Sequence, residues 1–248
     1  MVGRVFALLA AILLLGLPIA AQAQDDSLLA VDSGAVQVMS ADRAYDSYLA
    51  APAAEGAYPG IVLIHSFNGL EDGYRTMTDE FAAQGFVVLA VGWQTFERSP
   101  SDAVVAQLVQ DSVAFLSARD DVDSERLGLT GFCAGGRYTM LLLPQQDVFS
   151  AGVAWYGFPY SGDEPPVNFI DQLSAPLLVI HGSADSASRI GDIYRYVTAL
   201  DAAHKDFELK VYSGEPHGFM LSGGQLRQDP TAQDAFHEMV SYFQRNLA

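Results

Sequence analysis

The sequence is poor in cysteine and in basic residues. Its 248 residues include one cysteine, Cys133, and only two lysines, Lys205 and Lys210. A single thiol cannot form a disulfide within the chain, so Cys133 is a buried apolar residue, an intermolecular link or a reactive group. With 13 basic against 30 acidic residues, the formal net charge is −17. Because nucleic acids and anionic lipid surfaces attract basic patches, we expect neither as a partner.

Motifs that bind metals or nucleotides are also missing from the sequence. There is no H-E-x-x-H motif and no cysteine cluster, which argues against a metal site. No G-x-G-x-x-G loop and no Walker-type loop occurs, which argues against a bound nucleotide. We therefore expect no metal and no cofactor, and a small molecule as the partner.

The first 23 residues resemble a secretory signal. Residues 1–4 carry one positive charge, residues 5–21 form an apolar run, and residues 21–23 (Ala-Gln-Ala) are typical of a signal peptidase site. A transmembrane anchor is the alternative, but the run is short for a bilayer span and ends in the cleavage pattern. We expect cleavage near Ala23, export to the periplasm or the extracellular space, and no stable membrane insertion afterwards.

Residues 24–248 are expected to form a single α/β domain. Two short strands, residues 35–40 and 44–50 around a turn at 41–43, predict an antiparallel hairpin. Beyond residue 60, continuous apolar runs typical of strands buried on both faces alternate with amphipathic runs typical of helices. The predicted strands are residues 61–64, 86–91, 127–130, 151–156, 176–181 and 207–212, and the predicted helices are residues 74–84, a helix capped by Ser101, 188–203 and 231–247. This order predicts a mainly parallel sheet with helices on both faces.

The cysteine lies in a turn that has the form of a nucleophile elbow. Residues 131–135 (GFCAG) place one glycine on each side of Cys133, between the predicted strand 127–130 and a helix-like run at 138–143. In α/β hydrolases such a turn holds a strained nucleophile at the top of the sheet, and flanking side chains would collide with the adjoining strand and helix. The N-terminus of the helix also favours a thiolate. Taken alone, the motif is equally compatible with a buried structural thiol.

Two further residues follow the cysteine in the order that a hydrolase triad requires. Asp185 comes after the predicted strand 176–181, and His217 comes after the last predicted strand, 207–212. α/β hydrolases order their triads as nucleophile, acid and histidine. Each residue also has an ordinary explanation, because Asp185 can cap a helix and His217 can belong to a proline-containing turn. Their occurrence together and in order predicts a catalytic triad with Cys133.

From about residue 35 onward, the chain resembles the dienelactone hydrolase family of the α/β hydrolases. The resemblance rests on GFCAGGR (131–137), HGSAD (181–185), EPHGF (215–219), IVLIHSFNGL (61–70) and FVVLAVGWQTFERSP (86–100). It implies the α/β-hydrolase fold and hydrolysis of an ester or lactone by Cys133, His217 and Asp185. It also implies an oxyanion hole formed by the backbone amides of Phe67 and Ala134.

Two positions depart from the family pattern. Members that open dienelactones have a glutamate where this chain has Ser66, and an arginine that holds the substrate carboxylate where it has Leu221. A second such arginine aligns loosely with Arg98. The departures argue against dienelactone itself as the substrate. Ser66, Trp93, Arg98 and Tyr156 are candidate substrate contacts near strand ends, with core packing as the alternative for the two aromatic residues and a surface ion pair for Arg98.

The sequence therefore predicts a carboxylic ester hydrolase, which we expect to act as a monomer. Two other functions stay open: a non-catalytic small-molecule-binding protein on the same fold, and a single-thiol redox sensor, although no resolving cysteine is present. Arg137, just after the glycines, is predicted to form a structural ion pair. His65 and His181, at strand ends, are interpreted as pocket or packing residues.

Overall fold

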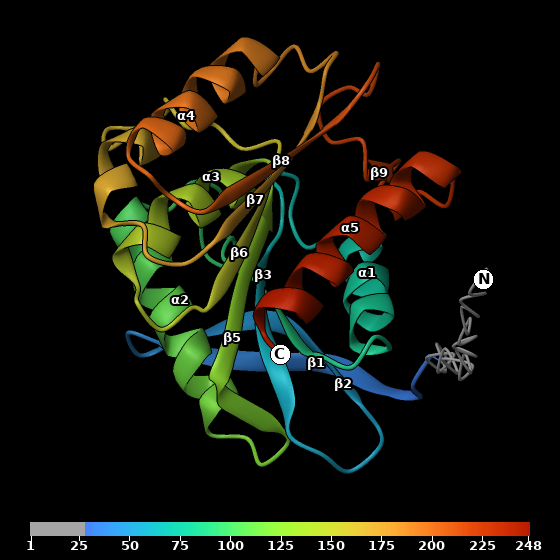
Figure 1. Cartoon of the computed structure of the whole chain (residues 1–248). Coiled ribbons are helices and arrows are strands. Elements are labelled where there is room, and N and C mark those ends of the chain that lie inside the picture. The colour runs from blue at the N-terminus through green and yellow to red at the C-terminus, as the bar shows by residue number, and fades with distance from the viewer. Residues whose placement is uncertain (1–27) are drawn as a thin grey trace, which may run out of the picture.

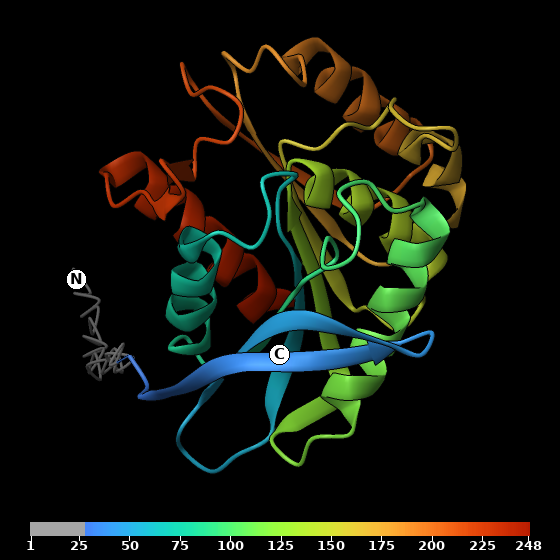
Figure 2. The same cartoon turned by 180° about the vertical axis from the view of Figure 1, so that it is seen from behind.

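The computed structural model describes residues 28–248, in which an eight-stranded sheet lies between two layers of helices (Figure 1 and, from behind, Figure 2). The strand order is β1-β2-β4-β3-β5-β6-β7-β8. The strands are β1 (Val31–Ser40), β2 (Arg43–Pro52), β3 (Tyr58–Ile64), β4 (Val87–Val91), β5 (Val122–Phe132), β6 (Ala151–Trp155), β7 (Leu177–Gly182) and β8 (Phe207–Tyr212). Strands β3 to β8 pair in parallel, whereas β2 pairs antiparallel with both β1 and β4. The predicted fold class is confirmed.

In residues 28–248, five α-helices cover the two faces of the sheet. They are α1 (Asp72–Ala82), α2 (Asp102–Ser117), α3 (Ala134–Leu142), α4 (Ile190–Ala202) and α5 (Pro230–Asn246). Helices α2, α3 and α4 share a core with Val62 and Ile64 of β3, while α1 and α5 share the opposite core with Ile61 and Leu63. Alternate residues of a strand point to opposite faces. Strand β3 is therefore buried on both sides, which explains why its sequence is continuously apolar.

Helix boundaries follow both local capping and tertiary packing. The Ser101 side chain accepts a hydrogen bond from the amide of Val104 and begins α2, as predicted. Helix α3 begins at Ala134, four residues before the run that looked helical in the sequence. Its first turn contains Gly135 and Gly136, which have poor helix propensity, so the close packing of this turn overrides the local preference.

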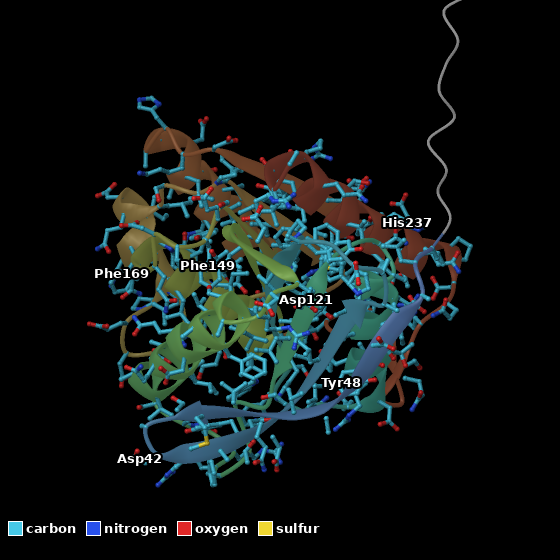
Figure 3. The ribbon with its side chains drawn as sticks, turned by 90° about the horizontal axis from the view of Figure 1, so that it is seen from below. Asp42, Tyr48, Asp121, Phe149, Phe169 and His237 are labelled. Atoms are coloured by element: carbon cyan, nitrogen blue, oxygen red, sulfur yellow. The ribbon has the colours of Figure 1, made fainter. Side chains whose placement is uncertain are left out.

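The N-terminal hairpin has a tighter turn than the sequence predicted. Ser40 already pairs with Arg43, so the turn consists of Ala41 and Asp42 alone, with φ angles of 46° and 63°. Positive φ at both positions matches the twist of the flanking strands in a two-residue hairpin. Figure 3 shows Asp42 at the tip of this hairpin.

Several short elements complete the chain. A small hairpin, β9 (Leu221–Ser222) and β10 (Gln225–Leu226), joins β8 to α5, and the sequence did not predict it. Residues 28–248 also contain two 3-10 segments, Leu143–Gln145 and Pro166–Gln172. No helix within residues 28–248 combines the length and apolarity of a membrane span. The signal sequence expected at residues 1–23 lies outside the described residues, so cleavage and export stay predictions.

Candidate active site

Cys133 occupies the sharp turn between β5 and α3. Figure 1 shows the end of β5 and the start of α3 at the upper rim of the sheet. Its backbone has φ = 59° and ψ = −111°, a strained conformation for a residue with a side chain. The Cys133 amide donates to the carbonyl of Trp155 at 3.0 Å, and its own carbonyl accepts from the amide of Arg137 at 3.0 Å. These bonds fix the half-buried thiol at the carboxyl end of the strand.

Three glycines of the elbow turn, residues 131–136, are required by close backbone contacts. A Cβ atom on Gly131 would lie 2.2 Å from the carbonyl oxygen of Gly135. A Cβ on Gly135 would lie 2.0 Å from the oxygen of Ile64, and one on Gly136 would lie 2.3 Å from the oxygen of Trp155. The start of α3 therefore packs directly on the ends of β3 and β6, which brings Cys133 close to the residues that follow β3.

Asp185 lies in the loop between β7 and α4, with its carboxylate buried. Oδ1 accepts hydrogen bonds from the amides of Ala187 (2.9 Å) and Ser188 (2.8 Å), while Oδ2 accepts one from His217 Nδ1 at 2.7 Å. Burial alone would raise the pKa of Asp185, but the bonds from His217 and Ser188 hold the pKa below its ordinary value. Arg189, rather than Asp185, is the N-cap residue of α4. The carboxylate is thus ionised and faces the imidazole.

His217 lies in the histidine loop, residues 213–220, which follows β8. Its ring packs against Tyr156 and Phe158, with centroid distances of 5.2 and 5.3 Å. Burial opposes protonation, but hydrogen bonding to Asp185 and to Cys133 raises the pKa of His217 to about 9. Nε2 is buried and, apart from Cys133, has no hydrogen-bonding partner among the described residues. This nitrogen is therefore free to exchange a proton with the nearby sulfur.

His181, at the end of β7, lies beside the carboxylate of Asp185. Its side chain is fully buried, and Nε2 donates to the carbonyl of Ser188 at 2.8 Å. The same nitrogen lies 3.5 Å from Asp185 Oδ2. Burial lowers the pKa of His181, which favours the neutral ring. The interpretation of His181 as a packing residue is confirmed, and its position beside the carboxylate is a detail that the sequence did not reveal.

The two amides predicted to form an oxyanion hole are available. Neither the amide of Phe67 nor that of Ala134 donates a hydrogen bond to another residue in the described part of the chain. The segment before Phe67 is held by its own polar groups: Ser66 Oγ accepts from the amide of Asn68 (3.2 Å), and the Ser66 carbonyl accepts from His65 Nδ1 (2.7 Å). Both amides thus lack an acceptor among the described residues, as the donors of an oxyanion hole must.

The four candidate substrate contacts have different environments. Trp93 is buried, donates from Nε1 to the carbonyl of His65 (3.1 Å) and stacks on the His65 ring, so the packing alternative describes it. Ser66 is also buried, within the loop described above. Tyr156 is buried against His217, with φ = 35°, and burial raises the pKa of its hydroxyl. Tyr156 is thus next to the imidazole but gives little surface to a ligand.

Arg98 is the candidate that lines a concave surface. Its guanidinium lies over the ring of Phe67, 4.7 Å from the centroid, and it forms no ion pair with another described residue. The surface ion pair considered from the sequence is therefore not found in residues 28–248. A hollow of about 380 Å³ is lined by Phe67, Asn68, Gly69, Gln94, Thr95, Phe96, Glu97 and Arg98. The hollow therefore includes Phe67, whose amide is one of the two predicted oxyanion donors, together with Arg98.

Arg137 has the structural role that the sequence predicted. Its Nη1 and Nη2 donate to the two carboxylate oxygens of Asp102, each at 2.7 Å, and Nε donates to the carbonyl of Ser161 at 2.8 Å. The pair joins the first turn of α2 to α3, so the guanidinium is committed to the scaffold. Within residues 28–248, no group of three or more His, Cys, Asp or Glu side chains is placed to hold a metal ion.

Two residues near the histidine were missed by the sequence analysis. Glu215 lies two residues before His217, and its carboxylate binds the guanidinium of Arg227 at 2.7 Å. The partners are twelve residues apart and are joined across the β9–β10 hairpin. No motif marks such a pair, because it depends on a hairpin that the sequence did not predict.

Comparisons with known proteins agree with this geometry. The chain matches the dienelactone hydrolase family over residues 45–98 and 91–247. A Methylorubrum extorquens protein named "Putative carboxymethylenebutenolidase" is 28% identical over 257 residues, covering 92% of this chain and 86% of that protein. A Klebsiella pneumoniae crystal structure of a "Putative Dienelactone Hydrolase" superposes with a TM-score of 0.79 at 24% identity, covering 87% of this chain and 99% of that one.

A more distant structure shows the same fold. The dienelactone hydrolase-like promiscuous phosphotriesterase from metagenomic libraries has a TM-score of 0.74 at 18% identity, and covers 88% of this chain and all of its own. At such identities the structures establish the fold, while the family match over most of the chain establishes the relationship. The chain belongs to the dienelactone hydrolase family of the α/β hydrolases and is a carboxylic ester hydrolase.

Proposed function

We propose that the protein hydrolyses a carboxylic ester or lactone through a triad of Cys133, His217 and Asp185, with a thioester intermediate on the cysteine. The observation that carries the proposal is the 2.7 Å hydrogen bond between His217 Nδ1 and Asp185 Oδ2, beside a strained cysteine at the end of β5. An imidazole oriented by a buried carboxylate is the arrangement that activates a nucleophile in triad enzymes.

In the acylation step, Cys133 Sγ forms a bond with the ester carbonyl carbon. The thiol proton goes to His217 Nε2, and Asp185 stabilises the imidazolium through Nδ1–H. The amides of Phe67 and Ala134 stabilise the oxyanion, a contribution of about 3 kcal/mol per donor. The carbon–oxygen bond of the ester then breaks, and the alcohol leaves with the proton held by His217.

In the deacylation step, water attacks the thioester carbonyl and gives a proton to His217. The carbon–sulfur bond breaks, the carboxylic acid is released, and the sulfur regains its proton from the imidazolium. A pKa of about 9 favours the imidazolium form of His217, which gives its proton to the leaving alcohol in the first step and to the sulfur in the second.

The substrate class follows from the groups around the elbow turn. Arg98 offers a cation without an ion-pair partner in the described chain, and its guanidinium lies over the ring of Phe67. Ser66 and Leu221 supply neither the carboxylate nor the second cation that dienelactone-opening members have. We propose a small ester or lactone with at most one anionic group, directed toward Arg98.

The test is hydrolysis of p-nitrophenyl acetate by wild type, Cys133→Ala, Cys133→Ser and His217→Ala. We expect both Cys133→Ala and His217→Ala to lower kcat by roughly 10³-fold or more, since triad members act as a unit. Equal rates for wild type and Cys133→Ala would refute the proposal and favour a binding protein. Changes that depend on oxidation, without turnover, would instead favour a thiol sensor.

A further inference from the structure

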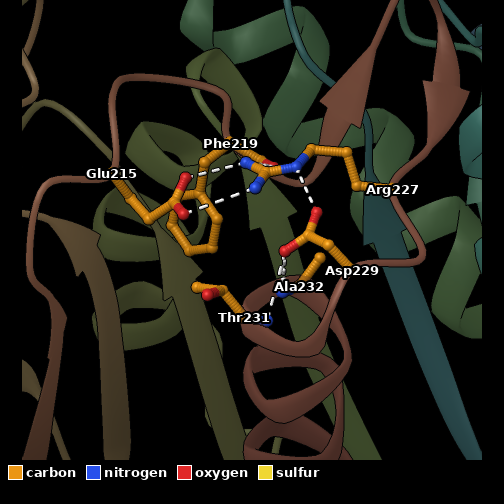
Figure 4. A network of polar contacts seen from close by, with 6 residues as sticks. All are labelled: Glu215, Phe219, Arg227, Asp229, Thr231 and Ala232. Atoms are coloured by element: carbon orange, nitrogen blue, oxygen red, sulfur yellow. Dashed lines mark hydrogen bonds and ion pairs between the residues drawn. The ribbon is translucent and has the colours of Figure 1, made fainter.

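One guanidinium holds the histidine loop on both sides of His217 (Figure 4). Arg227 Nη1 donates to Glu215 Oε2 and to the carbonyl of Phe219, both at 2.7 Å, and Nη2 lies 3.3 Å from Glu215 Oε1. Glu215 comes two residues before His217 and Phe219 comes two residues after it. The loop segment that carries the imidazole therefore cannot move away without losing at least one of these bonds.

The same guanidinium is anchored to a helix. Arg227 Nε donates to Asp229 Oδ2 at 2.6 Å, as Figure 4 also shows. Asp229 Oδ1 in turn accepts from the amides of Thr231 (3.1 Å) and Ala232 (3.3 Å), which caps the first turn of α5. The loop is thereby tied to a regular element of the fold rather than to another loop.

Glu215 also contacts the loop that carries the acid of the triad. Its carbonyl accepts a hydrogen bond from the amide of Ala184 at 3.0 Å, next to Asp185. A Cβ atom on Gly182 would lie 2.2 Å from the Glu215 carbonyl oxygen, so the two loops touch through their backbones. A shift of Glu215 would therefore disturb both partners of the His217–Asp185 hydrogen bond.

Burial separates this network from an ordinary surface ion pair. The side chains of Arg227 and Glu215 are 25% and 16% exposed, whereas the Arg245–Glu208 pair is 52% exposed on each side. Exposed pairs contribute little to stability. The planar guanidinium donates hydrogen bonds to Glu215, Phe219 and Asp229 at the same time. A lysine ammonium cannot reproduce that geometry.

We propose that Arg227 is a positioning residue for His217: its guanidinium fixes the residues on both sides of the histidine and so holds the imidazole against Asp185. The proposal rests on the proposed function for its catalytic consequence. It assigns Arg227 no contact with substrate. Arg227 instead keeps the imidazole in one orientation, so that its loss lowers the fraction of molecules ready to react.

The first experiment compares Arg227→Gln, Arg227→Lys and the control Arg245→Gln in p-nitrophenyl acetate hydrolysis. We expect Arg227→Gln to lower kcat by about tenfold or more with little change in KM, because substrate contacts are intact. Arg227→Lys should recover part of the loss by keeping the charge, and Arg245→Gln should equal wild type. If Arg227→Gln does not fold, Glu215→Gln tests the same contact with a smaller change.

The second experiment follows the His217 imidazole by NMR titration, which does not require turnover. In Arg227→Gln we expect its pKa to fall from about 9 toward 6.5, since the bond to Asp185 is populated less. An unchanged His217 pKa and kcat, with only a lower Tm, would overturn the proposal. If wild type fails to hydrolyse esters, the proposed function is refuted, while the titration still decides the role of Arg227.

Discussion

The elbow turn that carries Cys133 and the loop that carries His217 are held in place by different means. The elbow turn depends on backbone contacts that admit no Cβ atom at Gly131, Gly135 or Gly136. The histidine loop has no such restriction at Gly218, where a Cβ would meet nothing within 4 Å, although its φ of 72° favours glycine. Apart from the backbone contact between Glu215 and Gly182, that loop is held by the side chain of Arg227.

The difference shows which parts of an active site a sequence can reveal. A backbone that passes within contact distance of another backbone demands glycine at fixed positions, and this demand is visible as a motif. A loop that is held by charged side chains requires a particular residue type at a distant position in the sequence, where no local motif marks it. The nucleophile is therefore marked locally, while the support of the base is not.

The largest expected effect comes from adding one methyl group to the elbow turn. Gly135→Ala would place a Cβ atom 2.0 Å from the carbonyl oxygen of Ile64, so α3 must move away from β3. We expect loss of esterase activity and a drop of about 3 kcal/mol or more in the free energy of unfolding, measured by urea denaturation.

The matched control for that variant is Gly191→Ala, in the first turn of α4. A Cβ there would meet nothing within 4 Å, and the residue does not need positive φ. We expect the free energy of unfolding to rise by up to about 1 kcal/mol, with activity unchanged. Equal losses in the two glycine variants would contradict the account of the elbow turn.

The pKa of His217 should respond more to its acid than to its thiol. The hydrogen bond to Asp185 is the largest single cause that raises this pKa, ahead of the hydrogen bond to Cys133. We therefore expect the NMR-titrated pKa of His217 to fall further in Asp185→Asn than in Cys133→Ala. A larger fall in Cys133→Ala would mean that the thiol, rather than Asp185, governs the imidazole.

His217 and His65 should give opposite dependences of stability on pH. His217 has a raised pKa, so its contribution is complete below about pH 6.5 and is lost as the pH rises through about 9. Burial lowers the pKa of His65 to about 4, so folding stability falls as the pH drops from about 6.5 to 4. In urea denaturation across this pH range, we expect His217→Gln to reduce the alkaline slope and His65→Gln to reduce the acidic slope, to which buried His181 also contributes.

The smallest expected effect concerns the anchor of the histidine loop. Asp229→Ala removes the N-cap of α5 and one contact of Arg227, while the bonds from Arg227 to Glu215 and Phe219 remain. We expect the free energy of unfolding to fall by about 1 kcal/mol, with kcat for p-nitrophenyl acetate within about twofold of wild type. A loss of activity as large as that of Arg227→Gln would show that the helix anchor, rather than the grip on the loop, positions His217.

Much of the fold could be predicted because the sheet is buried on both faces. Residues 61–64 are continuously apolar since Ile61 and Val62 face opposite cores, and this pattern recurs in the other parallel strands. The start of α3 could not be predicted, because two glycines in its first turn have poor helix propensity. The β9–β10 hairpin was also missed, since its strands are two residues long.

Only those residues of the candidate site that belong to a recognisable sequence motif could be predicted. Cys133, Asp185 and His217 each follow a strand, and their order along the chain was sufficient to group them. Trp93 also follows a strand, yet its indole is buried against His65, which shows that position at a strand end does not distinguish packing from function. Arg227 follows no predicted strand, and its partners become neighbours only in the folded chain.

The most direct test of the central claim is the mass of the protein during turnover. Rapid acid quenching of wild type with p-nitrophenyl acetate, followed by peptide mass spectrometry, should show one acetyl group on Cys133, held as a thioester. His217→Ala should accumulate this adduct far more slowly, and Cys133→Ala should not form it. Acetylation of another residue at the rate of turnover would contradict the account. So would hydrolysis of the ester by Cys133→Ala at the wild-type rate with no adduct.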